Sequence, residues 1–309
     1  MALRTGDLLM AQFKKCPQWK NMTDEELVKL KKVMVSIASD YVSVCEKYNL
    51  KYIMGAGTCL GAVRHHGFIP WDDDMDFHMP RRDYMRLLEV AEKELGDKYY
   101  VRSISKGDSV TFPSTHIGLC NTRYVNYDDL IFEDEITDYK GIYIDVFPYD
   151  NVSSIKLLRN AKELISLMIL YLCSCIHINK AIVCLNKLGV EIDEEAQKAF
   201  RLKRFIGKIA GAIDVKKWIK FHDGFISNNK HDESLYVNCY MGKKMNKYTH
   251  LRSKIFGELN PGEFEGHKWN LPTDVEDYLS KEYDKNYMTP PPESKRKIHP
   301  VFELVFPVE

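Results

Sequence analysis

The sequence has no excess of charge of either sign, because 44 Lys and Arg side chains balance 44 Asp and Glu side chains and the isoelectric point is near 7.1. A neutral chain offers no broad basic surface, so we expect no nucleic-acid partner. Any anionic substrate must be bound by a local group of side chains. Internal repeats and low-complexity linkers are also lacking, and 309 residues, 45% of them hydrophobic, suffice for one large core or two smaller ones.

Cysteine motifs are missing too. The eight cysteines are scattered, and none forms a CxxC pair or a Cys/His spacing suited to zinc, which is typical of buried thiols in a reducing compartment. The first twenty residues lack the continuous apolar region and the small-residue cleavage site of a secretory signal. We therefore expect a cytoplasmic protein.

Long apolar runs are few. Residues 164–178 form an uncharged stretch of fifteen residues, short of the roughly 20 that a bilayer span requires. A buried or interface helix, a helix lying in a membrane surface and a true span all remain open, and the first is favoured because the stretch contains Ser, two Cys and a His. The second would place the protein at the inner face of the membrane by peripheral contact.

The hydrophobic periodicity predicts strands alternating with helices over residues 23–150, followed by mostly helix over 151–309. This order indicates an α/β or α+β core and a mostly helical second half, which we treat as two domains sharing one body. Expected helices cover 24–49, 58–66, 81–96, 154–186, 193–212, 214–228 and 273–283, with N-caps at Thr23, Asp193 and Asp214. Expected strands cover 51–54, 75–79, 99–104, 115–121, 142–147 and 235–240, and the stretch before the last helix is expected to be irregular.

The stretch GFIPWDDDMDF, residues 67–77, crowds four aspartates among apolar neighbours. A solvated acidic turn is the ordinary interpretation of a charge run, but it predicts polar neighbours. A calcium loop of the EF-hand type is excluded, because it requires Gly at the position of Phe77 and Glu at the position of Asp83. Adjacent carboxylates in an apolar setting repel one another unless a cation neutralises them.

Strand geometry favours a metal site. If a strand begins in DMDF, Asp74 and Asp76 point to one face, while Met75 and Phe77 enter the core. Two carboxylates at a strand end suit Mg²⁺, or Mn²⁺ in its place, which completes its shell with phosphate oxygens and water. Asp145 lies alone in the apolar strand 142–147, where it either caps or pairs locally or supplies a third carboxylate to the metal.

Two other aspartates flank this pair. Asp72 shares the alternation of Asp74 and is a possible metal ligand or support for one. Asp73 is expected to face elsewhere, and we assign it no chemistry. Trp71 is a candidate for stacking on a base or a quaternary ammonium, although core packing is the simpler role.

Glycines precede the acidic stretch. Gly57, beside Thr58, permits close approach of the backbone, and a helix starting near Thr58 offers N–H groups to an anion. Arg64 suits phosphate through its planar fork, with a surface ion pair as the alternative. His65 is a second donor candidate, or a partner for the last carbonyls of the helix. A strand, a glycine turn, a short helix and a strand bearing Asp-x-Asp follow the order of the polymerase-β-like nucleotidyltransferase fold.

These motifs together resemble the LicD family, which includes bacterial phosphocholine transferases and fukutin-related ribitol-phosphate transferases. The resemblance extends from about Cys45 to His299 and is weak over 152–260. It departs from the family pattern at Tyr-Asp-Lys-Asn-Tyr, 283–287, where Tyr-Gly-Asp is more usual. The stretches that carry the resemblance are GTCLGAVRHHGFIPWDDDMDF, RRDYMRLL, GIYIDVFPYD and FEGHKWNLPTDVEDYLSKEYDKNYMTPPPESKRKIH.

The resemblance implies a polymerase-β-like nucleotidyltransferase core that transfers a phospho-alcohol from a CDP-linked donor to a sugar hydroxyl of a glycan or a lipid-linked glycan, releasing CMP. It implies that Asp74 and Asp76 bind the metal and that Asp145 is a third ligand or the general base. The donor phosphates would be held by Gly57, Thr58 and Arg64. A metal-dependent glycosyltransferase and a catalytically degenerate glycan-binding protein are the rival hypotheses.

Overall fold

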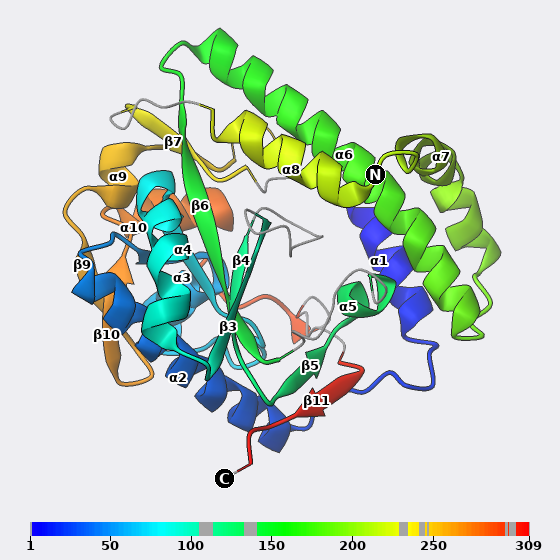
Figure 1. The fold of residues 1–309 in the computed structure, drawn as a ribbon, viewed down its shortest axis with the longest axis horizontal. Coiled ribbons are helices and arrows are strands. Elements are labelled where there is room, and N and C mark those ends of the chain that lie inside the picture. Colours follow the sequence, from blue (N-terminus) through cyan, green and yellow to red (C-terminus); the bar gives the residue numbers. More distant parts are fainter. Residues whose placement is uncertain are drawn as a thin grey trace.

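A computed structural model shows one mixed sheet covered on one side by a layer of long helices (Figure 1). The structure describes residues 2–104, 114–132, 141–228, 234–240, 245, 247–293, 296 and 301–308, with side chains from residue 5 onward. Part of the proline-containing stretch 289–300, including His299, lies outside these residues. The fold is α+β, in agreement with the sequence.

Seven strands of the described residues form the central sheet, in the order β1-β2-β6-β4-β3, with β7 paired to the end of β6 and β8 paired to β7. Only β2 and β6 run parallel among these pairs. The strands are β1 Ile53–Met54, β2 Asp76–Pro80, β3 Tyr99–Ser103, β4 Thr115–Leu119, β6 Tyr143–Val152, β7 Tyr236–Asn238 and β8 Thr249–Leu251.

Two amphipathic helices, α2 (Asp24–Lys47) and α4 (Arg81–Leu95), pack near this sheet. The predicted capping box at the start of α2 is confirmed, since the Thr23 hydroxyl accepts from the Glu26 N–H and the Glu26 carboxylate accepts from the Thr23 N–H. Tyr41 of α2 packs on Phe77 of β2 with ring centroids 4.9 Å apart, which fixes the outer strands to the helix.

The expected irregular stretch before the last helix is in fact structured. The strands β9 (Asn260–Phe264) and β10 (His267–Leu271) form an antiparallel hairpin there, because Gly266 adopts a φ of 80° that completes the turn. The remaining short elements, which the periodicity did not indicate, are α1 Ala2–Phe13, β5 Arg123–Val125, α5 Tyr127–Ile131, α9 Arg252–Phe256 and β11 Glu303–Val305.

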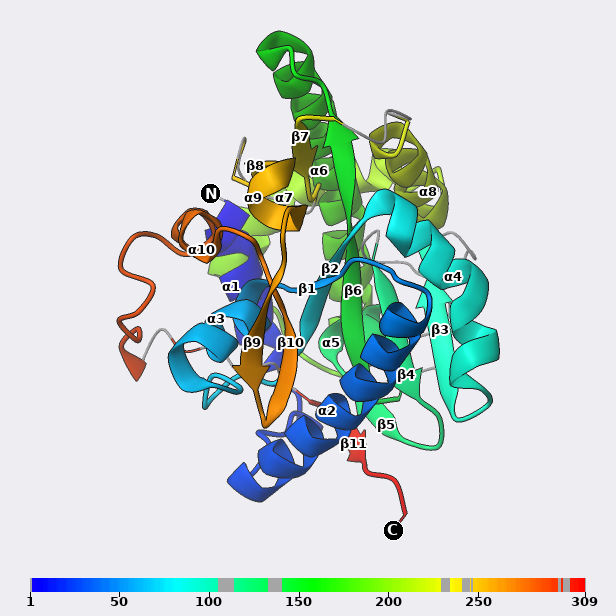
Figure 2. The ribbon, with the colours of Figure 1, turned by 90° about the vertical axis from the view of Figure 1, so that its left-hand side faces the viewer.

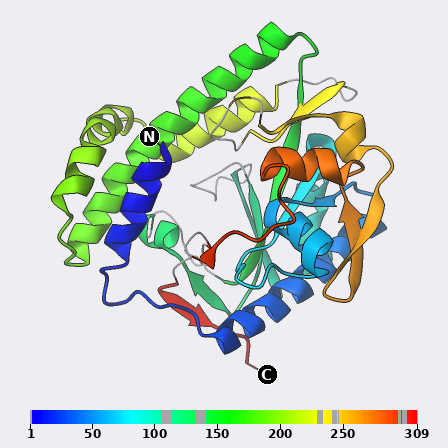
Figure 3. The ribbon, with the colours of Figure 1, turned by 180° about the vertical axis from the view of Figure 1, so that it is seen from behind.

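The long helices form a layer of their own, with α6 (Lys156–Lys187) across one side of the molecule and α7 (Glu194–Ala210) and α8 (Val215–Ile226) packed on it (Figure 3). Asp214 caps α8, as expected. Asp193 stands at the N-cap position of α7, but its side chain bonds Gln12 of α1 and Lys15, just after α1, and does not cap the helix.

A buried ion network fixes this layer to the sheet. Arg81, at the start of α4, donates two hydrogen bonds of 2.7 and 2.8 Å to Asp150 of β6 and pairs with Asp223 of α8 at 2.9 Å. The bidentate geometry suits a buried carboxylate. The expected domain division after residue 150 falls within β6 and stays a prediction, as does the nucleotidyltransferase identity of the core.

The other expected elements are present with shifted ends. The helix 58–66 begins two residues earlier, as α3 (Ala56–His65), and the last helix is α10 (Val275–Glu282). The strand expected at 142–147 continues to Val152 because β7 extends its pairing. None of the eight cysteines, all of which lie within the described residues, forms a disulfide, and six are buried, as the absence of cysteine motifs indicated.

Candidate functional site

Four polar side chains come from one row across the sheet. In this row Asp76 of β2 is paired with Asp145 of β6, and Asp145 with His116 of β4. His116 in turn is paired with Arg102 of β3. Residues directly opposite in neighbouring strands point to the same face, so the register brings four separate sequence segments into one cluster.

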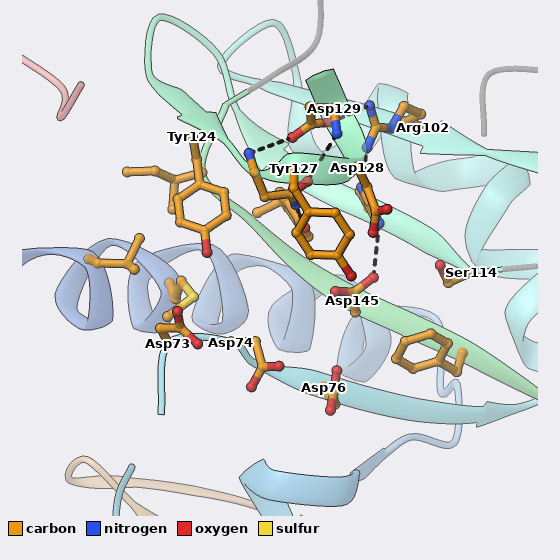
Figure 4. A pocket seen from close by; sticks show the side chains of 17 residues that line it. Asp73, Asp74, Asp76, Arg102, Ser114, Tyr124, Tyr127, Asp128, Asp129 and Asp145 are labelled. Carbon is orange, nitrogen blue, oxygen red and sulfur yellow. Dashed lines mark hydrogen bonds and ion pairs between the residues drawn. The ribbon is translucent and has the colours of Figure 1, made fainter. Parts of the chain in front are cut away.

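This row lines a pocket of about 350 Å³. Figure 4 shows Asp74, Asp76 and Asp145 on one side of it, with Tyr124 and Tyr127 opposite. Six aspartate carboxylates line the pocket, against one guanidinium, that of Arg102, and one imidazole, that of His116, so the pocket is strongly acidic. The residues are Leu30, Met34, Asp73, Asp74, Asp76, Arg102, Ser114, His116, Tyr124, Asn126, Tyr127, Asp128, Asp129, Ile142, Tyr143, Asp145 and Phe147.

The carboxylate of Asp76 is the most perturbed group in the cluster. Burial, followed by the negative charges of Asp74 and Asp145, raises its pKa well above the ordinary value. No ion pair to Asp76 is present among the described residues. A carboxylate in this position either keeps a proton or receives the charge of a cation.

Asp145 is held by a chain of hydrogen bonds. His116 Nε2 lies 3.0 Å from Asp145 Oδ1, and Arg102 Nη2 lies 2.6 Å from His116 Nδ1. A guanidinium can only donate, so Nδ1 accepts and Nε2 carries the proton that is donated to Asp145. The imidazole also stacks on Tyr143, with ring centroids 4.1 Å apart and planes within 7°. Asp145 therefore has a fixed orientation.

The glycine element adjoins the cluster without lining the pocket. A Cβ on Gly57 would lie 2.6 Å from Asp72 Oδ2, so Gly57 makes room for that carboxylate at the start of α3. The Thr58 hydroxyl accepts from the Asp76 N–H at 2.8 Å and thereby positions the first residue of β2. The N–H of Ala56 donates to the Tyr278 hydroxyl of α10 at 2.8 Å. Donor binding by Gly57 and Thr58 stays a prediction.

The other predicted binding residues contact the C-terminal part of the chain. Arg64 donates to the Tyr287 carbonyl at 2.8 Å and to His65 Nε2 at 2.9 Å. Trp71 lies under the Arg296 guanidinium, which is 4.2 Å from the ring centroid. Thus Trp71 already binds a cation, although one that the chain itself supplies.

The alternation around the acidic run is as expected for its apolar members, since Met75 and Phe77 are fully buried. The outer aspartates are placed differently. Asp73, to which we assigned no chemistry, is buried and lines the pocket, whereas Asp72 lies beside α3 and does not line it. The reason is that β2 begins only at Asp76, so strict alternation does not extend back to Asp72.

The comparisons with known proteins agree with this picture. Residues 49–159 match the family model described as "LicD/FKTN/FKRP, nucleotidyltransferase domain", and this range includes the acidic run and Asp145. The chain is also 29% identical over 287 residues to the "Lipopolysaccharide cholinephosphotransferase LicD" of Haemophilus influenzae, covering 88% of this chain and 94% of that protein.

The chain is therefore similar to LicD proteins over most of its length. Two uncharacterised Rickettsia proteins are similar over shorter stretches, one from Rickettsia typhi at 30% identity (38% of this chain, 34% of that protein) and one from Rickettsia prowazekii at 35% (24% and 30%). The resemblance drawn from the sequence motifs is thereby confirmed.

Several residues that line the pocket were not predicted from the sequence. His116 and Arg102 lie in strands that were expected, but the pairing of these strands cannot be deduced from one sequence. Tyr124, Asp128 and Asp129 follow a loop region without periodicity. The available signal was a polar, ionisable residue within each largely apolar strand, as in THIGL and YYVRS.

The donor set fits Mg²⁺ in kind. Mg²⁺ prefers hard carboxylate oxygens, which Asp74, Asp76 and Asp145 would supply. The raised pKa of Asp76 shows that its carboxylate is not neutralised by the surrounding side chains, and a cation would supply the missing positive charge. Within the described residues, however, no group of three or more His, Cys, Asp or Glu side chains is already close enough to hold a metal ion. The aspartates therefore match the ion in chemistry, and binding would require them to draw together.

A further carboxylate lies near the cluster, at the end of α10. The Glu282 side chain is 6% exposed, lies 3.9 Å from Lys247 Nζ and leaves Oε1 without a hydrogen bond among the described residues. Burial raises the pKa of Glu282 to about 7, and Lys247 opposes this shift. Glu282 in turn contributes to the raised pKa of Asp76.

We predict that Glu282 lowers the free energy of unfolding as the pH rises. Its folded-state pKa exceeds the unfolded value of about 4.3, so its protonated form stabilises the fold and this contribution is lost as pH rises towards 7. Urea unfolding should show wild type losing about 2–3 kcal/mol relative to Glu282→Gln between pH 5 and pH 8. The exposed Glu276→Gln on the same helix is the control and should show no such change. Parallel pH profiles for wild type and Glu282→Gln would contradict the assignment.

Proposed function

We propose that this chain transfers phosphocholine from a CDP-linked donor to a sugar hydroxyl of a surface glycan, or of its lipid-linked precursor, and releases CMP. The observation that carries the proposal is the cross-strand row, which brings Asp76, Asp145 and His116 into one acidic pocket. The name of the Haemophilus influenzae relative, a lipopolysaccharide cholinephosphotransferase, supports phosphocholine and lipopolysaccharide as the substrate classes.

The pocket wall favours choline over a polyol. Tyr124, Tyr127 and Tyr143 line it together with Asp128 and Asp129. Aromatic faces and carboxylates attract a quaternary ammonium group, whereas a polyol has no charge for them to recognise. These residues would hold the trimethylammonium end of the donor, and the carboxylates of β2 and β6 would face its diphosphate.

A divalent cation is required by the charges involved. Asp74 and Asp76 would hold Mg²⁺ or Mn²⁺, with Asp145 near it, and the ion would neutralise the diphosphate and the departing CMP. Without that positive charge, the anionic donor and the six pocket carboxylates would repel one another. The arrangement therefore couples binding of the donor to binding of the cation.

The remaining chemistry is a proton transfer. As the acceptor hydroxyl oxygen bonds to the phosphorus of phosphocholine, the bond from that phosphorus to the CMP oxygen breaks, and the acceptor proton passes to Asp145. His116 donates to Oδ1, so the second oxygen of Asp145 is the one that would take the proton. Arg102 keeps His116 in the tautomer that this requires.

A donor panel tests the proposal. We expect CMP release from CDP-choline with Mg²⁺ and a sugar acceptor, little release from CDP-ribitol or CDP-glycerol, and none when EDTA is added. Asp145→Asn should lower kcat by about 10²–10⁴-fold. CMP and the acceptor product would be measured by chromatography.

Other outcomes of the panel are informative. Release of UDP from a UDP-sugar would establish the rival glycosyltransferase and contradict the proposal. Full activity of Asp74→Ala/Asp76→Ala would show that these carboxylates are not catalytic. Glycan binding without turnover of any donor would indicate the degenerate alternative.

A second prediction concerns His116. Gln places an amide N–H near the position of Nε2, so His116→Gln should stay within about tenfold of wild-type kcat, whereas His116→Phe keeps the stack on Tyr143 and should lose about 10²-fold. The donor KM should change little in either variant, because His116 acts on Asp145. Steady-state kinetics separates the two constants, and equal losses in Gln and Phe would contradict the positioning role.

A further inference from the structure

Exposed apolar side chains are concentrated in one part of the molecule. Of the 21 large hydrophobic residues exposed among the described residues, 14 lie between residues 155 and 235, on or beside α6, α7 and α8. They are Ile155, Leu157, Leu158, Leu164, Ile165, Met168, Tyr171, Val183, Leu202, Phe205, Ile209, Ile213, Phe221 and Leu235. An apolar surface of this extent is typical of an interaction site.

The same region carries the positive charge of the chain. Residues 156–226 contain 13 Lys and Arg against seven Asp and Glu, whereas the remaining residues contain 31 against 37. On α7 the exposed cations Lys198, Arg201 and Lys208 alternate with the exposed apolar residues. The chain as a whole is neutral because the net positive charge of the helical layer is cancelled by the net negative charge of the other residues.

The apolar residues of α6 form a stripe. Leu157, Leu164, Met168 and Tyr171 recur at helical spacing on the first half of the helix, which projects beyond the sheet in Figure 2. The same stripe continues at Cys175, where α7 covers it.

The outer side of α7 faces the same way as this stripe. A Cβ on Gly207 of α7 would lie 2.2 Å from the Cys175 carbonyl, so α7 packs on α6 through its Gly207 side. Leu202, Phe205 and Ile209, each about 64% exposed, lie on the opposite side of α7. We name the stripe of α6 together with these three residues the helical face.

We propose that the helical face rests on the surface of a bilayer that contains anionic lipid. Apolar side chains flanked by Lys and Arg are the composition of interfacial helices, whose cations reach the headgroups while the apolar side chains enter the acyl boundary. The net positive charge of the layer complements anionic headgroups.

α6 is long and apolar enough by length and composition to cross a membrane, but its contacts favour lying on the surface. Its other side buries Glu163 and Ser166, and the Ser166 hydroxyl bonds His222 of α8 at 2.7 Å. A span would expose these polar groups to lipid.

The same helix links the helical face to the pocket. His177 of α6 bonds Asp128 of the pocket wall at 2.6 Å, so α6 contacts the pocket wall with one side and carries part of the helical face on another. This placement, which rests on the proposed function, lets a lipid-linked acceptor remain in the bilayer while its sugar reaches the pocket. It also agrees with the expected location at the inner face of the membrane.

Vesicle sedimentation of the full chain, without donor or acceptor, tests the proposal. Wild type should sediment with phosphatidylcholine vesicles that contain about a quarter phosphatidylglycerol, more weakly with pure phosphatidylcholine, and less at high salt. Leu202→Ser/Phe205→Ser should weaken partitioning about tenfold or more. Val28→Ser/Met85→Ser, which removes exposed apolar side chains from α2 and α4, is the matched control and should bind as wild type does.

Three results would overturn the proposal. They are the absence of wild-type binding to anionic vesicles, an equal loss in the control pair, and vesicle binding that is unchanged in Leu202→Ser/Phe205→Ser. CMP release with a water-soluble acceptor, measured in parallel, should be unchanged in both pairs. Failure of the transferase proposal would abolish that release and leave vesicle binding intact, so the two failures are distinguishable.

Discussion

The repulsion among carboxylates where β2 pairs with β6 is the constraint on which the rest of the site depends. The parallel register sets Asp76 beside Asp145, and the chain before β2 adds Asp74. A slip of one residue would turn Asp145 into the core and Val146 into the pocket, so the register and the apolar packing of Val146 and Phe77 enforce each other. The fold thus holds carboxylates close together although they repel one another. This repulsion, together with burial, raises the pKa of Asp76.

The side chains around these carboxylates determine which substrate groups the pocket suits. His116 and Arg102 orient Asp145 from the other side of the row, and the tyrosines across the pocket provide surfaces for an organic cation. Under the proposed function, the anionic donor would enter together with a metal. The basic charge lies elsewhere, on the helical layer, so the acidic pocket and the basic face occupy opposite sides of α6. Although the net charge of the chain is zero, negative charge is concentrated in the pocket and positive charge on the helical layer. This separation is consistent with a charged substrate in the pocket and contact between the helical layer and an anionic surface.

Local physics explains how much of this was predictable from sequence. The capping box at Thr23, the helical spacing in α2 and the alternation of Met75 and Phe77 are short-range signals, and each was confirmed. The family resemblance and the local sequence pattern were enough to predict that Asp74, Asp76 and Asp145 lie in one site. The partners of Asp145 could not be predicted, because the register of β4 against β6 is set by packing between distant segments. Asp72 and Asp73 lie elsewhere than expected because β2 begins only at Asp76, and the β9–β10 hairpin was not predicted from the sequence pattern.

The most direct test of the central claim is thermal unfolding with and without Mg²⁺ or Mn²⁺, comparing wild type with Asp76→Asn. If the fold holds carboxylates that require a cation, wild type should gain several degrees in Tm with the metal, as binding to the native state requires. Asp76→Asn should be at least as stable as wild type in EDTA and gain little from the metal. Equal metal-induced shifts in both proteins, or no shift in wild type, would contradict the account.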